Sequence, residues 1–158
     1  KTASAKHLLS ENEMKISRVV CACSVGTLLL LAQKATAEQI PYADKTKVTA
    51  GQAVYEQNCA SCHGKNLEGQ FNWQKRSKDG YLPAPPHDET GHTWHHPDQM
   101  LFELTKYGPQ KFAGSDYKSI MPAYGGKLSD EEIWNVLAYI KSKWPKEIQR
   151  KHTEAFGK

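Results

Sequence analysis

Apolar residues recur at helical spacing in three parts of the chain. The clearest part is the segment 129–145, where Ser129 and Glu132 have the spacing of a capping box and Pro145 stops the pattern. Its apolar positions share one helical face: Ile133, Val136, Leu137, Tyr139, Ile140 and Trp144. This arrangement predicts an amphipathic helix that packs one face on a core.

Two further helices are predicted from less regular patterns. One begins near Thr49, which has capping-box spacing with Gln52, and continues toward Cys59. The other begins at Pro97, which suits a first helical turn, and ends at Gly108. Its apolar positions are Met100, Leu101 and Leu104. No comparable pattern supports strands, so the predicted fold class is all-α.

The stretch 64–97 separates the first two helices and has no sustained period. It holds four glycines and four prolines. A structureless connection of that length is unusual inside a compact domain, and three short helices bury a limited apolar area. We therefore expect a large flat cofactor in the core, around which this loop is organised. The segment 146–158 is mostly polar, and we expect it to be a loosely attached tail.

The N-terminal region has the layout of a secretory signal peptide. After Met14, two basic residues, Lys15 and Arg18, precede an uncharged run over 19–32, and cleavage is expected after Ala37. A bilayer-spanning helix needs about 20 apolar residues, so a permanent span is the weaker interpretation, and an uncleaved anchor stays open. The expected layout is a non-native or unstructured leader (1–13), a signal peptide (14–37), one folded domain (38–145) and a polar tail (146–158). The protein is then exported to the periplasm.

Composition and charge narrow the possible functions. The chain has 158 residues, of which 39% are hydrophobic and 24% are charged. This length and composition are typical of one globular domain and exclude a large multidomain enzyme. The formal net charge is +4, but the part after residue 37 carries only +1. A nearly neutral domain argues against a nucleic-acid partner, which requires a clustered basic surface. Once the signal is removed, Cys59 and Cys62 are the remaining cysteines, so at most one disulfide can form.

The run Cys59-Ala60-Ser61-Cys62-His63 is a C-x-x-C-H motif, the attachment signature of a c-type haem. The two thiols can bond the two vinyl groups of one haem while the imidazole of His63 ligates the iron. A thioredoxin-like dithiol would need a βαβ setting, which the pattern lacks. A zinc site would need two more ligands, taken from His92, His95 or His96. The motif therefore predicts one haem c with its iron, attached through Cys59 and Cys62.

An iron that only transfers electrons needs a sixth ligand, and a methionine thioether is the ligand that raises its potential. Met14 belongs to the signal, and Met100 shares a helical face with apolar neighbours, as a core residue does. Met121 is different, because it precedes Pro122 in an irregular segment just before the last helix. We therefore predict His63 and Met121 as the iron ligands, with ordinary packing as the alternative role of Met121.

These features together resemble class I, mitochondrial-type cytochromes c, of the small bacterial monohaem kind. The resemblance covers about residues 48–145 and rests on three parts of the sequence. These are the attachment motif, the Met121-Pro122 loop, and Gly51 and Tyr55 opposite the last helix, as in the family's crossed terminal helices. The resemblance implies the cytochrome c fold, in which three main helices and long loops wrap around one covalently bound haem.

The resemblance also implies roles for residues near the haem. In the family, a proline carbonyl accepts a hydrogen bond from the proximal imidazole, and Pro85 is favoured over Pro83 and Pro86 for this role. Trp94 is expected to pack on the haem or to donate its indole N–H to a propionate. The stretch 91–96 departs from the family, and two interpretations stay open. Its three histidines either form a polar lead-in to the next helix or bind copper or zinc.

The function implied by the resemblance is that of a periplasmic one-electron carrier, not an enzyme. The expected partners are redox proteins such as a membrane oxidase, reductase or dehydrogenase, and the expected state is a monomer. The membrane is a partner only if the signal stays uncleaved. One alternative is a haem c subunit of a periplasmic dehydrogenase or of a copper-linked oxidoreductase. Another is a gas sensor in which Met121 is labile.

Overall fold

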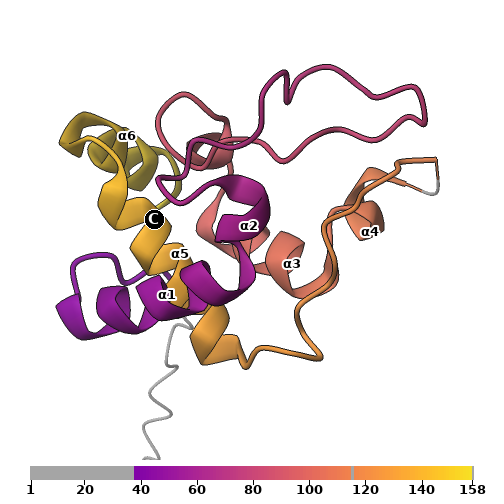
Figure 1. Ribbon diagram of the computed structural model, residues 1–158. Helices are drawn as coiled ribbons and strands as arrows, with labels where there is room; N and C mark the ends of the chain where they lie inside the picture. Colours follow the sequence, from indigo (N-terminus) through magenta and orange to yellow (C-terminus); the bar gives the residue numbers. More distant parts are fainter. Residues whose placement is uncertain (1–37, 115, 158) are drawn as a thin grey trace, which may run out of the picture. The chain divides into compact units, whose positions relative to one another are not determined.

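The computed structural model describes residues 38–114 and 116–157, which form helices joined by loops (Figure 1). The predicted leader and signal peptide lie outside the described residues. The helices are α1 (Lys45–Asn58), α2 (Ala60–His63), the 3-10 turn η1 (Thr93–His95), α3 (Asp98–Tyr107), α4 (Gln110–Ala113), α5 (Asp130–Lys143) and α6 (Lys146–Phe156). This part of the chain has no strand, which confirms the all-α class. None of its helices is long and apolar enough to cross a membrane.

Helix α1 begins about one turn before the predicted start. Its N-cap is Asp44, whose carboxylate accepts hydrogen bonds from the backbone N–H groups of Thr46 at 2.9 Å and Lys47 at 3.3 Å. The expectation that Thr49 opens the helix is wrong, because its hydroxyl donates to the carbonyl of Lys45 inside the helix, at 2.9 Å. A carboxylate is favoured at this end because it pairs with free N–H groups and with the helix dipole.

Helices α3 and α5 agree with the prediction. Helix α3 follows Pro97 and is capped by Gly108. Helix α5 has the predicted capping box, in which the Ser129 hydroxyl accepts from the Glu132 N–H at 3.2 Å. In return, the Glu132 carboxylate accepts from the Ser129 N–H at 2.8 Å. Local sequence signals were sufficient here because each cap satisfies backbone groups within four residues of itself.

Helices α1 and α5 cross in close contact (Figure 1). Gly51 permits the approach, since a Cβ at this position would lie 1.8 Å from the carbonyl oxygen of Asn135. One turn later, the fully buried Tyr55 packs on Tyr139, with ring centroids 5.3 Å apart. The Tyr55 hydroxyl donates to the carbonyl of Gly64 at 2.8 Å. The crossing therefore fixes the chain directly after the attachment motif.

Helix α6 occupies the segment that we expected to be a loosely attached tail, and that expectation is wrong. The buried face of α6 is polar, with Gln149 and His152 only 3% and 1% exposed. The Gln149 amide donates to the carbonyls of Lys141 at 3.0 Å and Trp144 at 3.1 Å. His152 Nε2 donates to the carbonyl of His96 at 2.9 Å. These bonds satisfy carbonyls at the end of α5 and beside η1, so α6 docks without a wide apolar face.

A buried cluster of ionisable groups lies where α3, α5 and α6 meet. Lys141 Nζ and His152 Nδ1 each lie 3.6 Å from Asp98 Oδ1. The other oxygen of Asp98 accepts the backbone N–H of Ile40 at 2.9 Å. Burial and the neighbouring charge of Lys141 hold the pKa of His152 below its usual value, against the opposing effects of its hydrogen bond to His96 and of Asp98. His152 is accordingly neutral at pH 7, with its proton on the Nε2 that bonds to His96.

The lowered pKa of His152 predicts an acid-sensitive contribution to stability. Below about pH 6.5 the unfolded chain protonates this histidine before the folded chain does, so the unfolding free energy falls with pH until the pKa of the folded state is reached. For one proton the slope is at most about 1.4 kcal/mol per pH unit. His152→Gln keeps a donor for the His96 carbonyl and does not titrate. In urea unfolding, the stability difference between parent and variant is expected to change between pH 7 and pH 5, in the variant's favour at acid pH. A difference that is constant with pH would contradict this account.

Candidate functional site

A cavity of about 470 Å³ lies among α2, α3, α5 and the loops that flank them. Its wall is largely apolar and includes Leu82, Leu101, Leu104, Ile120, Leu137 and Ile140. Sulfur and imidazole groups lie in the same wall. An apolar cavity with few polar groups is the usual form of a site for a cofactor-sized ligand.

Cys59 and Cys62 enter this wall from the junction of α1 and α2. Cys59 is the C-cap of α1, and the single turn of α2 carries Cys62. Both are free thiols, with Cys59 half-buried and Cys62 exposed. Burial raises the pKa of the Cys59 thiol to about 11. The thiol is therefore protonated at neutral pH, unlike the low-pKa thiolate of a dithiol oxidoreductase.

His63 ends α2 and is held by a backbone carbonyl. Its Nδ1 donates to the carbonyl oxygen of Pro85 at 2.9 Å, and its ring lines the cavity. This bond requires the tautomer in which Nε2 carries the free lone pair. Burial lowers the pKa of His63, which favours the neutral imidazole. A neutral imidazole with one nitrogen hydrogen-bonded and the other free has the form of a metal ligand.

Pro85 reaches His63 because two neighbouring residues draw its segment inward. Gln70 pairs with Ala84 through two hydrogen bonds: its N–H donates to the Ala84 carbonyl at 2.9 Å, and its side-chain oxygen accepts the Ala84 N–H at 2.8 Å. Gly69 has φ +68°, and a Cβ there would lie 2.4 Å from the nitrogen of Pro86. A side chain at position 69 would therefore push the Pro85 carbonyl away from the imidazole.

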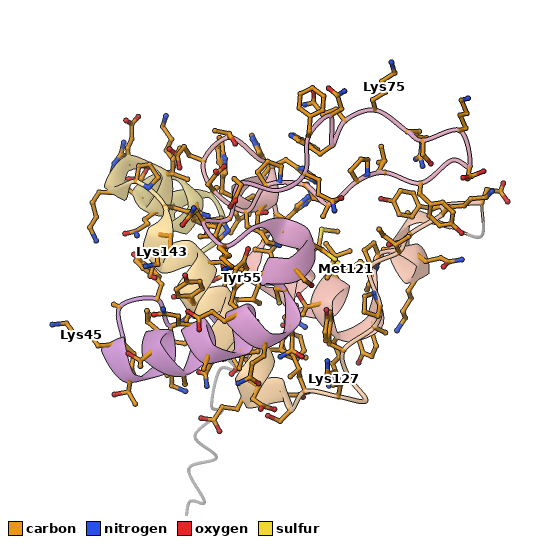
Figure 2. All side chains as sticks on the ribbon, in the orientation of Figure 1. Lys45, Tyr55, Lys75, Met121, Lys127 and Lys143 are labelled. Atoms are coloured by element: carbon orange, nitrogen blue, oxygen red, sulfur yellow. The ribbon has the colours of Figure 1, made fainter. Side chains whose placement is uncertain are left out.

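Met121 lines the same cavity from the segment between α4 and α5 (Figure 2). Its N–H donates to the hydroxyl of Ser119 at 3.1 Å, and its side chain packs on the buried cluster that includes Leu101 and Leu137. Met100 also lines the cavity, from α3, and is 40% exposed. Met100 therefore shares the cavity wall with its helical neighbours Leu101 and Leu104.

The structure places Trp94 away from the cavity wall. Its indole N–H donates to the carbonyl of Glu89 at 3.3 Å, and its ring stacks on His95 at a centroid distance of 3.7 Å. Trp73 lines the cavity instead and stacks on His92 at 5.3 Å. No periodic signal in the sequence marks Trp73, because it lies in the long loop whose path depends on tertiary contacts.

The three histidines of the stretch 91–96 do not converge. His92 and His96 line the cavity with ring centroids 5.5 Å apart, whereas His95 stacks on Trp94. Within residues 38–114 and 116–157, no group of three or more His, Cys, Asp or Glu side chains is arranged to hold a metal ion. The geometry thus offers no support for a copper or zinc site here.

Comparison with known proteins supports the interpretation of the cavity as a cofactor site. The sequence model of the family described as Cytochrome c matches residues 48–144. The chain belongs to the cytochrome c family. The matched span begins within α1 and ends with the cap of α5, and it includes the attachment motif and Met121. Helix α6 lies outside it.

The individual relatives include small cytochromes and subunits of larger proteins. Cytochrome c6 of Diacronema lutheri is 32% identical over 61% of this chain and 95% of its own length. Cytochrome c-555 of Chlorobaculum tepidum is 29% identical over 79% of this chain and 95% of its own. The fructose dehydrogenase cytochrome subunit of Gluconobacter japonicus is 33% identical over 61% of this chain but only 19% of its own length. No solved structure matches the chain significantly.

These relationships define the class of the protein. It is a class I monohaem cytochrome, an electron carrier and not an enzyme, and its cofactor is a covalently bound haem c with iron. The residues present fit that group, since one apolar cavity holds two free thiols, an imidazole with its Nε2 lone pair free, and thioether sulfur atoms. The predicted fold is confirmed, with α2, α4 and α6 added to the three expected helices.

Proposed function

We propose that Cys59 and Cys62 carry the two thioether bonds to the haem, and that His63 and Met121 are the axial ligands of its iron. The observation that carries the proposal is the hydrogen bond from His63 Nδ1 to Pro85, inside a cavity that both thiols and Met121 also line. That bond leaves Nε2 as the free donor atom of the imidazole. Trp94 is not part of the proposed site, because its indole N–H is already bonded to Glu89.

The side chains of the site tune and protect the redox centre. A bound haem iron supplies a one-electron change between the ferric and ferrous states. With haem bound, His63 and Met121 would both ligate the iron, so no ligand position would remain for a substrate. The bond to Pro85 fixes the tautomer of His63 and makes its Nε2 a stronger donor. The apolar wall excludes water, and both this burial and a thioether ligand favour a high potential.

We further propose that the cytochrome works as a periplasmic monomer that passes electrons between redox proteins. The signal-like segment 14–37 supports export, and the relatives that this chain nearly spans are cytochromes c6 and c-555. The second candidate is a haem subunit of a dehydrogenase or a copper-linked oxidoreductase. It is supported by the fructose dehydrogenase cytochrome subunit, and the chain also covers 39% of the oxidase subunit FixP of Sinorhizobium medicae.

Potentiometry combined with purification from the native periplasm distinguishes the two candidates. The carrier is expected to purify alone, as a monomer, and to titrate reversibly in a single one-electron step. A dehydrogenase subunit would instead purify in fixed stoichiometry with a second protein and would be reduced by that protein's substrate. N-terminal sequencing of the same material is expected to begin at Glu38. Purification as a stable complex would contradict the proposal that the cytochrome is a monomeric carrier.

A further inference from the structure

His87 lies in the cavity wall directly beside the proposed proximal ligand. The rings of His63 and His87 are stacked, with centroids 4.0 Å apart and an interplanar angle of 21°. This separation is close to the contact distance of two flat rings. The sequence contained no signal for the pair, because the two residues are 24 positions apart and His87 follows a run of prolines.

The position of His87 is fixed by hydrogen bonds to three separate segments. Its backbone N–H donates to the carbonyl of Leu67 at 2.8 Å, and its own carbonyl accepts the indole N–H of Trp144 at 2.7 Å. In the side chain, Nδ1 is hydrogen-bonded to the hydroxyl of Thr93 at 2.8 Å. Main chain and ring are therefore both held, and the ring presents a fixed flat face to His63.

The bond from His63 to Pro85 does not by itself fix the plane of the imidazole. The terminal torsion of a histidine side chain has a broad energy profile, and a hydrogen bond to a carbonyl tolerates a wide range of directions. Rotation of the ring can therefore occur while the Nδ1 bond persists. A rigid ring stacked at 4.0 Å removes that freedom, because rotation would drive one edge of His63 into His87.

We propose that His87 is a positioning residue that sets the plane of the His63 imidazole relative to the haem. The inference rests on the proposed role of His63 as an axial ligand. Thr93 acts one step further out, since its hydroxyl holds the ring of His87. With haem bound, the orientation of the His63 imidazole would affect its overlap with the iron orbitals. His87 and Thr93 would in this way influence the electronic structure of the ferric centre.

The test compares two substitutions of His87 in the haem-loaded protein. His87→Phe keeps a flat ring for stacking and loses the Thr93 bond, whereas His87→Leu keeps apolar bulk and loses the flat face. The electron paramagnetic resonance g-values of the ferric protein and the spread of its haem-methyl NMR shifts report the orientation of the axial ligands. We expect His87→Leu to change both quantities, and His87→Phe to change them less, because the phenyl ring keeps the flat face but loses the Thr93 bond.

A matched pair at position 93 keeps the test decisive if a His87 variant fails to fold. Thr93→Val is nearly isosteric but lacks the hydroxyl, and Thr93→Ser retains it. We expect Thr93→Val to shift the g-values and the haem-methyl shifts in the direction of His87→Leu. Thr93→Ser is expected to keep the parent values. A purely structural role would lower the melting temperature of these variants and leave the g-values unchanged, which would overturn the proposal. Failure of the axial assignment itself would be seen separately, as the absence of a low-spin His/Met signal in the parent protein.

Discussion

Gly51→Ala is expected to destabilise the cytochrome by about 3 kcal/mol or more, because the added methyl group has no room. Its Cβ would lie 1.8 Å from the carbonyl oxygen of Asn135 and 3.0 Å from the nitrogen of Val136. Both are backbone atoms of α5, so α1 and α5 must move apart. In an exposed helix the same substitution would stabilise by roughly 1 kcal/mol, so even the sign of the effect is diagnostic. Urea unfolding of the haem-loaded protein measures it.

The control for this substitution is Gly126→Ala. A Cβ at position 126 meets no atom within 4 Å, so the variant is expected to unfold near the parent midpoint. Equal stability of the parent and Gly51→Ala would contradict the crossing of α1 and α5. The fixed position of the chain after α2 would then need a different physical cause.

Met121→Ala is expected to open the distal side of the haem. The ferric protein should lose the weak absorption band of methionine-ligated iron, and the ferrous protein should bind CO at neutral pH. The midpoint potential should fall by on the order of 100 mV, because the thioether is the ligand that raises it. Optical titration measures all three effects.

Met100→Ala is the matched control, since Met100 lines the same cavity from α3. This variant should keep the methionine band and remain closed to CO. If instead Met100→Ala loses the band and Met121→Ala keeps it, the two methionines exchange roles. Rapid CO binding by the unaltered protein would favour the sensor alternative, in which the distal ligand is labile.

Features that depend on local contacts were predictable from the sequence. The capping box at Ser129 and the start of α3 after Pro97 involve groups within one helical turn. The attachment motif is equally local, because the C-cap of α1 and one turn of α2 bring Cys59 and Cys62 to the same cavity. In each case the contacts join residues that are close in the sequence, so the sequence pattern is sufficient to predict them.

Features that depend on long-range contacts could not be predicted in the same way. Helix α6 buries the polar side chains of Gln149 and His152. A search of the sequence for periodic apolar residues therefore does not detect its buried face. The choice of Trp73 over Trp94 in the cavity wall depends on the path of the loop between α2 and η1, which no local pattern specifies. The stacking of His87 on His63 likewise arises only when Leu67, Thr93 and Trp144 hold the loop.

The central claim is that a haem is covalently bonded to the two thiols of the motif. The most direct test is the mass of the denatured, acid-extracted protein together with its reduced optical spectrum. We predict that the polypeptide is heavier by one haem and keeps c-type absorption bands after extraction. The Cys59→Ala/Cys62→Ala double variant should have the bare polypeptide mass. A colourless parent protein with the mass of the polypeptide alone would contradict the claim.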